Sequence, residues 1–395
     1  MRACTMRPLC THFTFHMAAS TLTYCGDSPL PGSHRIVVRR TCPMRYAVLL
    51  HEELHIASNF HSEGCDLLRE HGQVEIVAIR RGEEEAAFEQ FLALLKEVDA
   101  AVIGCWHRPA MQPEHWRQAE NLKVFAGTFD NRFAGWVDFD LLDASGITLI
   151  DTSRSMTPSV AEFALAMTLN LVRDIPASMY LVREGGWQTH PFDSWVKPGF
   201  VYGDLTGRRV GLAGLGSINR RYAELIAPFR CDVRVYDPFV SDNVFAQYGV
   251  KRANSLVELA QQSEIFVVGL PPIPTTLEVI NRDVIFALPK GALFVLVTRM
   301  AVVEQQALWE RVENDEIAAA VDVFAPEPPP EDAWFRQHPN VLATPHIAGG
   351  TEFCHRRCLT DACKDAIAVL NGETPRFRAT KRDALLYEGE LAPVA

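Results

Sequence analysis

Short apolar runs alternate with more polar, helix-compatible segments along two long stretches of this chain. Such alternation is typical of βαβ units, which build a parallel sheet covered by helices. We therefore predict an α/β protein with two doubly wound parallel-sheet domains. The first domain has expected strands at 46–50, 74–79, 100–105, 122–126 and 147–150, and the second, beginning at Arg209, has them at 232–236, 264–269, 292–297 and 317–323.

Size and composition exclude several classes of protein. A length of 395 residues fits about two domains at the common 100 to 200 residues each. The 48% apolar content is enough for large cores, which argues against wholesale disorder. The net charge of -11 disfavours a nucleic-acid partner, and the apolar runs are too short for a membrane span. Ten cysteines without a C-x-x-C pair argue against a disulfide scaffold.

Residues 1–43 differ from the rest of the chain. They are rich in arginine, contain a single acid, Asp27, and show no periodicity. We expect a disordered extension here. A transit peptide and an unstructured segment ahead of an internal start at Met44 are both compatible with it.

A glycine-rich turn opens the second stretch with Gly214-Leu215-Gly216-Ser217-Ile218-Asn219. Glycine lets backbone N–H groups approach a pyrophosphate, and the following helix N-terminus adds partial positive charge. The next strand ends in Asp237, 21 residues beyond Gly216. A carboxylate there can accept both ribose hydroxyls and would repel a 2'-phosphate, so the pattern favours NAD over NADP. Asn219 replaces the third glycine of the fingerprint, which puts the close packing of helix on strand in doubt.

Four elements together resemble the D-isomer-specific 2-hydroxyacid dehydrogenase family. They are the glycine turn with Asp237, the loop Leu270-Pro271-Pro272-Ile273-Pro274-Thr275-Thr276, Arg299, and a D-V-F-x-x-E-P run at 322–328 followed by T-P-H-I at 344–347. The resemblance covers about residues 44–375 and implies a Rossmann cofactor domain, 153–347, inserted in a flavodoxin-like substrate domain, 44–152 plus 348–380. Residues 381–395 would be a tail, with no regulatory domain after Thr374.

The resemblance also implies roles for individual residues. His346 would exchange a proton with the substrate hydroxyl, Glu327 would orient the imidazole, and Arg299 would bind the substrate carboxylate. In the formate branch a glutamine usually stands at position 327, so formate is disfavoured. The implied cofactor positions are Gly214, Gly216, Ser217, Ile218, Asp237, Pro271, Thr276, Thr298, Asp322, His346 and Gly349, and the implied substrate positions are Gly127, Thr128, Arg299 and His346.

The expected activity is hydride transfer between NAD(H) and a 2-hydroxy or 2-keto acid, D-specific as in the family. The resemblance implies a cytoplasmic homodimer, with the apolar region 158–181 either at the interface or buried within one subunit. Departures from the family include Leu296, Met300-Ala301, Phe129 and Met156. We expect them to give an unusual pocket, suited to a bulky apolar substrate or impaired in activity.

Two alternative hypotheses come from other functional classes. His51-Glu52-Glu53-Leu54-His55 matches the H-E-x-x-H of zinc peptidases, but it directly follows a strand and lacks a third ligand, so we expect no metal. Cys354 and Cys358, four residues apart, are explained by one packed helix face. The family also includes NAD-binding transcriptional corepressors, so the chain could be a sensor with little or no turnover. Tight NAD binding without turnover would favour that hypothesis.

Overall fold

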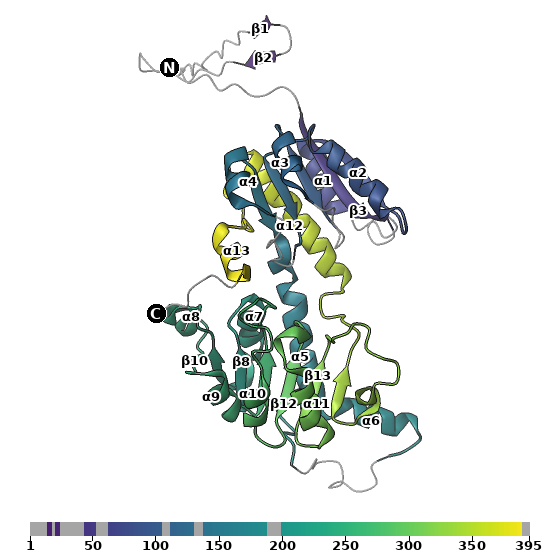
Figure 1. Ribbon diagram of the computed structural model, residues 1–395, viewed down its shortest axis with the longest axis vertical. Helices are drawn as coiled ribbons and strands as arrows, with labels where there is room; N and C mark the ends of the chain where they lie inside the picture. Colours follow the sequence, from purple (N-terminus) through teal and green to yellow (C-terminus); the bar gives the residue numbers. More distant parts are fainter. Residues whose placement is uncertain are drawn as a thin grey trace, which may run out of the picture.

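The computed structural model describes residues 14–17, 20–23, 43–52, 62–104, 111–129, 137–187 and 199–388. Two parallel sheets dominate this part of the chain, one of five strands and one of seven (Figure 1). The α/β fold class with two parallel-sheet domains is thereby confirmed. The expectation for residues 1–43 lies outside the described residues, apart from the short strands Thr14–Met17 (β1) and Ser20–Thr23 (β2), which pair with each other.

The five-stranded sheet forms the first domain, in the order β4-β3-β5-β6-β7. Helices cover both of its faces: α2, α3 and α4 contribute to one core cluster, and α1 and α12 to the other. Burial on both faces explains why its strands are nearly continuous apolar runs. The elements are β3 (Met44–His51), α1 (Ser62–His71), β4 (Gly72–Ile79), α2 (Glu84–Leu94), β5 (Ala100–Ile103), α3 (Pro113–Gln118), β6 (Val124–Gly127), α4 (Phe139–Ser145) and β7 (Thr148–Asp151).

The seven-stranded sheet forms the second domain, in the order β10-β9-β8-β11-β12-β13-β14. The strand order reverses between β8 and β11, and ligands of such sheets bind beyond the carboxyl ends of the strands at that point. The elements are α5 (Thr157–Arg173), α6 (Ile175–Arg183), β8 (Arg209–Ala213), α7 (Ser217–Ile226), β9 (Asp232–Tyr236), α8 (Asp242–Gln247), β10 (Lys251–Arg252), α9 (Leu256–Gln261), β11 (Ile265–Val268), α10 (Arg282–Ala287), β12 (Leu293–Leu296), α11 (Gln305–Glu313), β13 (Ala318–Val321) and β14 (Val341–Ala343).

The chain crosses between the domains twice, through the 3-10 turn Thr152–Met156 and through the segment before helix α12 (Glu352–Leu370). The Ser155 hydroxyl donates to Asp361 at 2.6 Å, and Arg357 Nε donates to the Ser155 carbonyl at 2.6 Å, so the first crossing is bonded to α12. Helix α12 returns to the first domain, where Cys354 and Cys358 are buried. Their burial agrees with the packed-face interpretation.

A final helix, α13 (Lys381–Glu388), lies where the sequence suggested only a tail. The segment before it pairs with the edge strand β7, because Asp151 N–H donates to Phe377 O and Ala379 N–H donates to Leu149 O, both at 2.9 Å. In Figure 1, α13 lies between the two domains. None of the described helices has the length and apolar character needed to cross a membrane.

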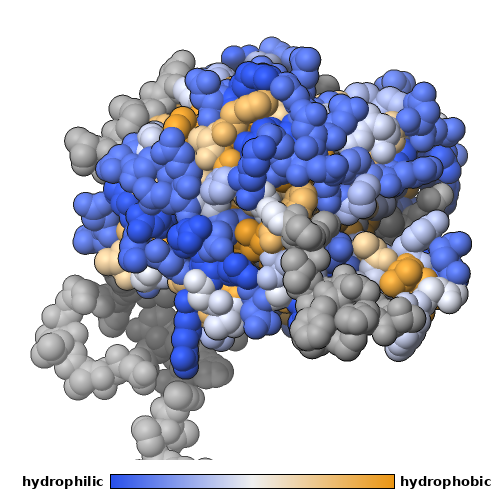
Figure 2. Space-filling model, turned by 90° about the horizontal axis from the view of Figure 1, so that it is seen from below, coloured by the Kyte–Doolittle hydropathy of each residue, from blue (hydrophilic) through white to orange (hydrophobic). Residues whose placement is uncertain are grey.

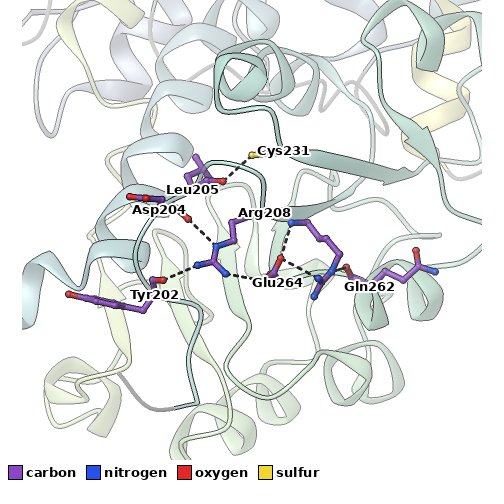
Figure 3. Close-up of polar contacts among 8 residues, drawn as sticks. Tyr202, Asp204, Leu205, Arg208, Cys231, Gln262 and Glu264 are labelled. Atoms are coloured by element: carbon purple, nitrogen blue, oxygen red, sulfur yellow. Dashed lines mark hydrogen bonds and ion pairs between the residues drawn. The ribbon is translucent and has the colours of Figure 1, made fainter. Parts of the chain in front are cut away.

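A polar cluster lies at the opposite, amino-terminal edge of the second sheet (Figure 3). The Glu264 carboxylate accepts from the Arg208 guanidinium and from the Arg209 backbone N–H, each at 3.0 Å. Arg208 also donates to the carbonyls of Tyr202 at 2.8 Å and Asp204 at 3.0 Å. The cluster therefore ties the loop that enters β8 to the start of β11.

We expect Glu264→Gln to lower the free energy of unfolding at pH 7 by about 1–3 kcal/mol, because Arg208 loses a half-buried charged partner, the Glu264 side chain, which is 18% exposed. Burial raises the pKa of Glu264, but the hydrogen bonds from Arg209 and Arg208 hold that pKa below its usual value. The stabilisation is therefore present above the unfolded pKa of about 4.3 and is lost as the pH falls through the lower folded pKa. Urea unfolding across this pH range measures it.

Glu97→Gln is the matched control, since Glu97 also pairs with an arginine but its side chain is 58% exposed. Exposed pairs contribute only about 0–1 kcal/mol. The stabilising role of ionised Glu264 would be contradicted if Glu264→Gln lowered the free energy of unfolding no more than Glu97→Gln does. It would also be contradicted if the loss stayed the same down to about pH 3, below the ordinary pKa range of carboxyl groups.

Candidate active site

A cleft of about 820 Å³ opens at the carboxyl edge of the second sheet, beside the reversal of strand order. Its walls include residues that follow β8, β9, β11 and β12, and residues of the first domain and the C-terminal segment. Of the residues predicted from sequence, the cleft brings together Gly214, Gly216, Ser217, Ile218, Asp237, Pro271, Thr276, Thr298 and Arg299.

The glycine turn is preorganised at this edge. Gly214 has a φ of 87°, which glycine adopts readily, and a Cβ there would lie 2.8 Å from the Leu270 side chain. A Cβ at Gly216 would meet only the Gly269 carbonyl, at 3.8 Å. Asp237 fixes the turn, accepting from Leu215 N–H at 2.7 Å through Oδ2. The turn thus leaves open space next to its backbone, and it fits the pyrophosphate of a dinucleotide.

Asn219 packs where the fingerprint has its third glycine. Its side chain is fully buried, and its Nδ2 donates to the carbonyls of Ala213 at 3.2 Å and Gly214 at 2.8 Å. The space it needs comes from Gly269 at the end of β11, where a Cβ would lie only 2.4 Å from the Asn219 amide. Helix α7 and strand β11 therefore still pack closely, although the sequence put this in doubt. The glycine that makes room is Gly269 after the strand, and not a residue of the helix.

His346 and Glu327 form a hydrogen-bonded pair near the cleft. His346 Nδ1 lies 2.8 Å from Glu327 Oε2, while Glu327 Oε1 accepts from Phe324 N–H at 2.7 Å. Burial raises the pKa of Glu327, but the hydrogen bonds from Phe324 and His346 and the charge of Arg299 hold that pKa below its usual range. An ionised Glu327 can only accept, so the proton of the neutral imidazole lies on Nδ1.

Asp322 supports the loop that carries His346. It is fully buried, its Oδ1 accepts from the Thr344 hydroxyl at 2.6 Å and Ile347 N–H at 3.0 Å, and its Oδ2 accepts from Ala348 N–H at 2.9 Å. His346 itself has a φ of 55°, a left-handed conformation that is sparsely populated outside glycine. The buried Asp322 carboxylate therefore holds His346 in an otherwise unfavourable conformation. The contact of Asp322 with the cofactor stays a prediction.

This chain is similar in sequence to known proteins. A sequence model of the D-isomer specific 2-hydroxyacid dehydrogenase NAD-binding domain matches residues 165–348. The chain is 30% identical over 289 residues to the D-3-phosphoglycerate dehydrogenase of Mycobacterium tuberculosis, covering 72% of this chain and 52% of the relative. It is 27% identical over 322 residues to that of Methanocaldococcus jannaschii, covering 80% and 57%. The match to the family model and the similarity to these relatives support membership of the D-isomer-specific 2-hydroxyacid dehydrogenase family.

The family assignment identifies NAD as the cofactor. The chain spans about half the length of the curated relatives it matches. Among solved structures, a phosphoglycerate oxidoreductase from Rhizobium etli matches with a TM-score of 0.70 at 22% identity, covering 85% of this chain and 99% of that one. This likeness shows that the two-domain architecture is common to both proteins.

Most departures from the family pattern do not face the cleft. Leu296 and Met300 are buried in the core of the second domain, and Phe129 is buried in the core of the first, where its ring stacks on Phe125 at 5.9 Å. The bulk of these three side chains therefore fills the cores, and their influence on the substrate pocket stays a prediction. Met156 does line the cleft.

The remaining predicted residues lie outside the cleft lining. Gly127 is the last residue of β6 and Thr128 follows it. The Thr152 hydroxyl donates to the Gly127 carbonyl at 3.1 Å and lies 2.9 Å from the Thr128 hydroxyl. Gly349 lies against Met156 at the second crossing. Asp322, Glu327 and His346 are also beyond the lining. Residues 130–133 of the predicted substrate loop lie outside the described residues.

The H-E-x-x-H match divides between a strand and residues that are not described. His51 belongs to β3, and Glu52 pairs with Arg80 at 2.8 Å, whereas Glu53, Leu54 and His55 lie outside the described residues. A helix carrying both histidines therefore cannot include His51. Among the described residues, no group of three or more potential ligands could hold a metal ion.

Sequence reasoning missed two contributors to the cleft. Asp151, only 5% exposed, accepts from Phe129 N–H at 2.9 Å and from Ser153 N–H at 3.0 Å, and so joins the first crossing to the end of β6. An aspartate at a strand end followed by Ser153 is a turn-forming pattern that could have indicated this. The C-terminal segment lines the cleft through Arg378, Arg382 and Leu386.

Proposed function

We propose that the chain is an oxidoreductase that transfers a hydride between NAD(H) and a 2-hydroxy or 2-keto acid, with D-specificity as in its family. The observation that carries the proposal is the His346–Glu327 hydrogen bond of 2.8 Å, at the sheet edge where Arg299 and the glycine turn also lie. No relative named above supports the sensor alternative, since each is named as a dehydrogenase or oxidoreductase.

His346 would handle the proton of the reaction. With Nδ1–H donated to Glu327, the other ring nitrogen has a lone pair that can accept a proton from the substrate hydroxyl. In the reverse direction the imidazolium returns that proton to the carbonyl oxygen. Glu327 would stabilise the imidazolium and fix its orientation, a positioning role that depends on Glu327 staying ionised.

Arg299 would bind the substrate carboxylate. Its Nη1 donates to the Thr298 carbonyl at 2.7 Å, which orients the guanidinium at the end of β12. Arginine stays cationic at any working pH and offers several donors in one plane, which suits a carboxylate. The same charge favours negative charge on the substrate oxygen as the proton leaves.

The second domain would hold the dinucleotide across the reversal of strand order. NAD supplies the hydride acceptor and donor when bound. Gly214 to Ser217 would contact the pyrophosphate, and the remaining lone pairs of Asp237 would accept the ribose hydroxyls, which disfavours a 2'-phosphate. We further propose that residues 153–347 form the cofactor domain, with hinges near Thr152 and Gly349, and that the protein is cytoplasmic.

The test is NADH oxidation, followed by absorbance, over a panel of 2-keto acids from glyoxylate and hydroxypyruvate to branched and aromatic members, with NADPH in parallel. We expect turnover with one group of acids and a preference for NADH. Demonstrated NADH binding with no turnover on the whole panel would reject the enzyme and favour the sensor. Chiral analysis of the product decides D-specificity.

We propose that the protein forms a homodimer through α6. Ile175, Met179 and Val182, at helical spacings of four and three residues, are 38%, 48% and 54% exposed, and no residue of α6 is buried. Figure 2 views the molecule from below, where hydrophobic residues form patches in a mainly hydrophilic surface. An apolar stripe of this kind marks an interaction surface, and a second copy is its most common partner in soluble proteins.

We expect light scattering to give twice the mass of one chain for the wild type and a monomer for Met179→Glu, because a buried unpaired charge opposes association. Leu277→Glu is the matched control, since Leu277 is an equally apolar side chain that is 56% exposed on another surface. A Met179→Glu variant that stays dimeric would reject α6 as the interface.

A further inference from the structure

Helix α13 has two distinct faces. Ala384 is buried in a core cluster of the first domain, and Lys381, three residues earlier, pairs with Asp140 of α4 at 2.7 Å. Arg382 and Leu386, four residues apart on the other face, line the cleft. Because residues at this spacing lie one above the other on a helix, one face anchors α13 and the other faces the cleft.

The position of α13 is fixed before the helix begins. Residues 377–379 extend the first sheet by pairing with β7, and Thr380 N–H and its hydroxyl both donate to Asp383, at 2.8 and 2.7 Å. The Asp383 carboxylate is thereby engaged at the start of the helix. The segment is thus part of the first domain although it faces the second.

The cleft-facing arginines of this segment lack protein partners. Within the described part of the chain, the guanidinium groups of Arg378 and Arg382 make no ion pair or hydrogen bond. On the opposite wall, by contrast, Arg220 donates to the Leu215 carbonyl at 2.8 Å and Arg221 to Glu224 at 2.9 Å. Arg378 and Arg382 are therefore available to a ligand, as is Arg154 of the first crossing, whose guanidinium only stacks on the Phe377 ring.

A protein with a net charge of -11 repels an anionic ligand unless local charge opposes that field. The cleft is locally basic, since six arginines and four carboxylates line it. The glycine turn offers backbone N–H groups from the second domain only. A pyrophosphate seated there would present its other oxygens toward the first domain, where two unpaired guanidinium groups line the same cleft.

We propose that Arg382, assisted by Arg378, binds the pyrophosphate of the dinucleotide, so that the C-terminal segment is part of the cofactor site. The inference rests on the proposed function, because it concerns how the same cofactor is held. Arginine suits phosphate oxygens through paired N–H donors and a permanent charge. The apolar side chain of Leu386, on the same face, would cover the adenosine side of the cleft beside Phe239 and Val240.

This arrangement couples cofactor binding to the relative position of the domains. The phosphate-binding turn belongs to the second domain and Arg382 to the first, so a ligand that contacts both favours the closed arrangement. Cofactor binding would then bring the first domain toward the second before the acid is bound.

The experiment measures the affinity for ADP-ribose by isothermal titration calorimetry and for NADH by fluorescence titration. ADP-ribose contains the pyrophosphate but lacks the nicotinamide, so it reports binding without turnover. The variants are Arg382→Gln, Arg382→Lys and, as the matched control, Lys381→Gln, which removes the same charge from the neighbouring residue on the anchored face. Circular dichroism and thermal unfolding confirm that each variant is folded.

We expect Arg382→Gln to weaken ADP-ribose binding about tenfold, the loss of one charge-assisted hydrogen bond. Arg382→Lys would lose less, because it keeps the charge, and Lys381→Gln would change the affinity by less than about twofold, as expected for an exposed and screened charge. Wild-type affinity in Arg382→Gln would overturn the inference, as would an equal loss in Lys381→Gln.

The two proposals fail differently. If Arg382→Gln binds ADP-ribose with unchanged affinity while the wild-type protein turns over 2-keto acids, the role of α13 is rejected and the proposed function stays in place. A wild type that binds ADP-ribose through Arg382 but reduces no acid supports the role of α13 and rejects the enzyme.

Discussion

We expect His346→Ala to lower kcat by about 10³-fold while the affinity for NADH stays unchanged. The loss follows from removing the group that exchanges the proton, a contribution of about 10²–10⁴ in general acid–base catalysis. NADH affinity is expected to be retained because the glycine turn and Asp237, which would bind the pyrophosphate and the ribose, are unchanged in this variant. Steady-state kinetics with the preferred acid and fluorescence titration of NADH measure the two quantities.

Two further variants sharpen this prediction. Glu327→Gln removes the ionised partner of the imidazole but leaves a hydrogen-bonding side chain, so we expect a smaller loss in kcat than in His346→Ala and an altered pH profile. His71→Ala, at the exposed end of α1, is the control. Loss of NADH binding in His346→Ala would contradict the proton-transfer role. A His346→Ala variant with the kcat of the wild type would reject that role.

The strands and the site residues could be predicted because their signals are local. The apolar run 232–236 coincides with β9, and Asp237 must follow it at the sheet edge where the glycine turn lies. Arg299 follows β12 in the same way. Parallel strands bring their carboxyl ends to one edge, so order along the chain was enough to bring these residues to one cleft.

The contributions that sequence reasoning missed depend on contacts between distant segments. Nothing local distinguishes a pocket position from a core position when the residue is apolar, so Met300 and Phe129 were assigned to the substrate side although both are buried in cores. The role of α13 depends on the pairing of residues 377–379 with β7, a strand that lies far earlier in the chain. Only the spacing of Arg382 and Leu386 was a local signal.

The pair Asn219–Gly269 also escaped prediction, because compensation between a helix and a neighbouring strand has no fixed spacing. We expect Gly269→Ala to lower the free energy of unfolding by about 1–3 kcal/mol, as overpacking does in a filled core. The new Cβ would lie 2.4 Å from the Asn219 amide, and moving that buried amide breaks its bonds to Ala213 and Gly214. Urea unfolding followed by circular dichroism measures the loss.

A double-mutant cycle isolates the cause. In the Asn219→Gly background the clash is absent and the glycine returns to its usual position on the helix, so Gly269→Ala should destabilise by much less than in the wild type. Gly350→Ala is the control, because a Cβ at Gly350 meets its nearest atom at an ordinary 3.5 Å. Equal effects of Gly269→Ala in both backgrounds would contradict the compensation. The contact between α7 and β11 positions the turn that carries Gly214 and Gly216. We therefore expect Gly269→Ala to weaken NADH binding as well, and the double variant to bind NADH again.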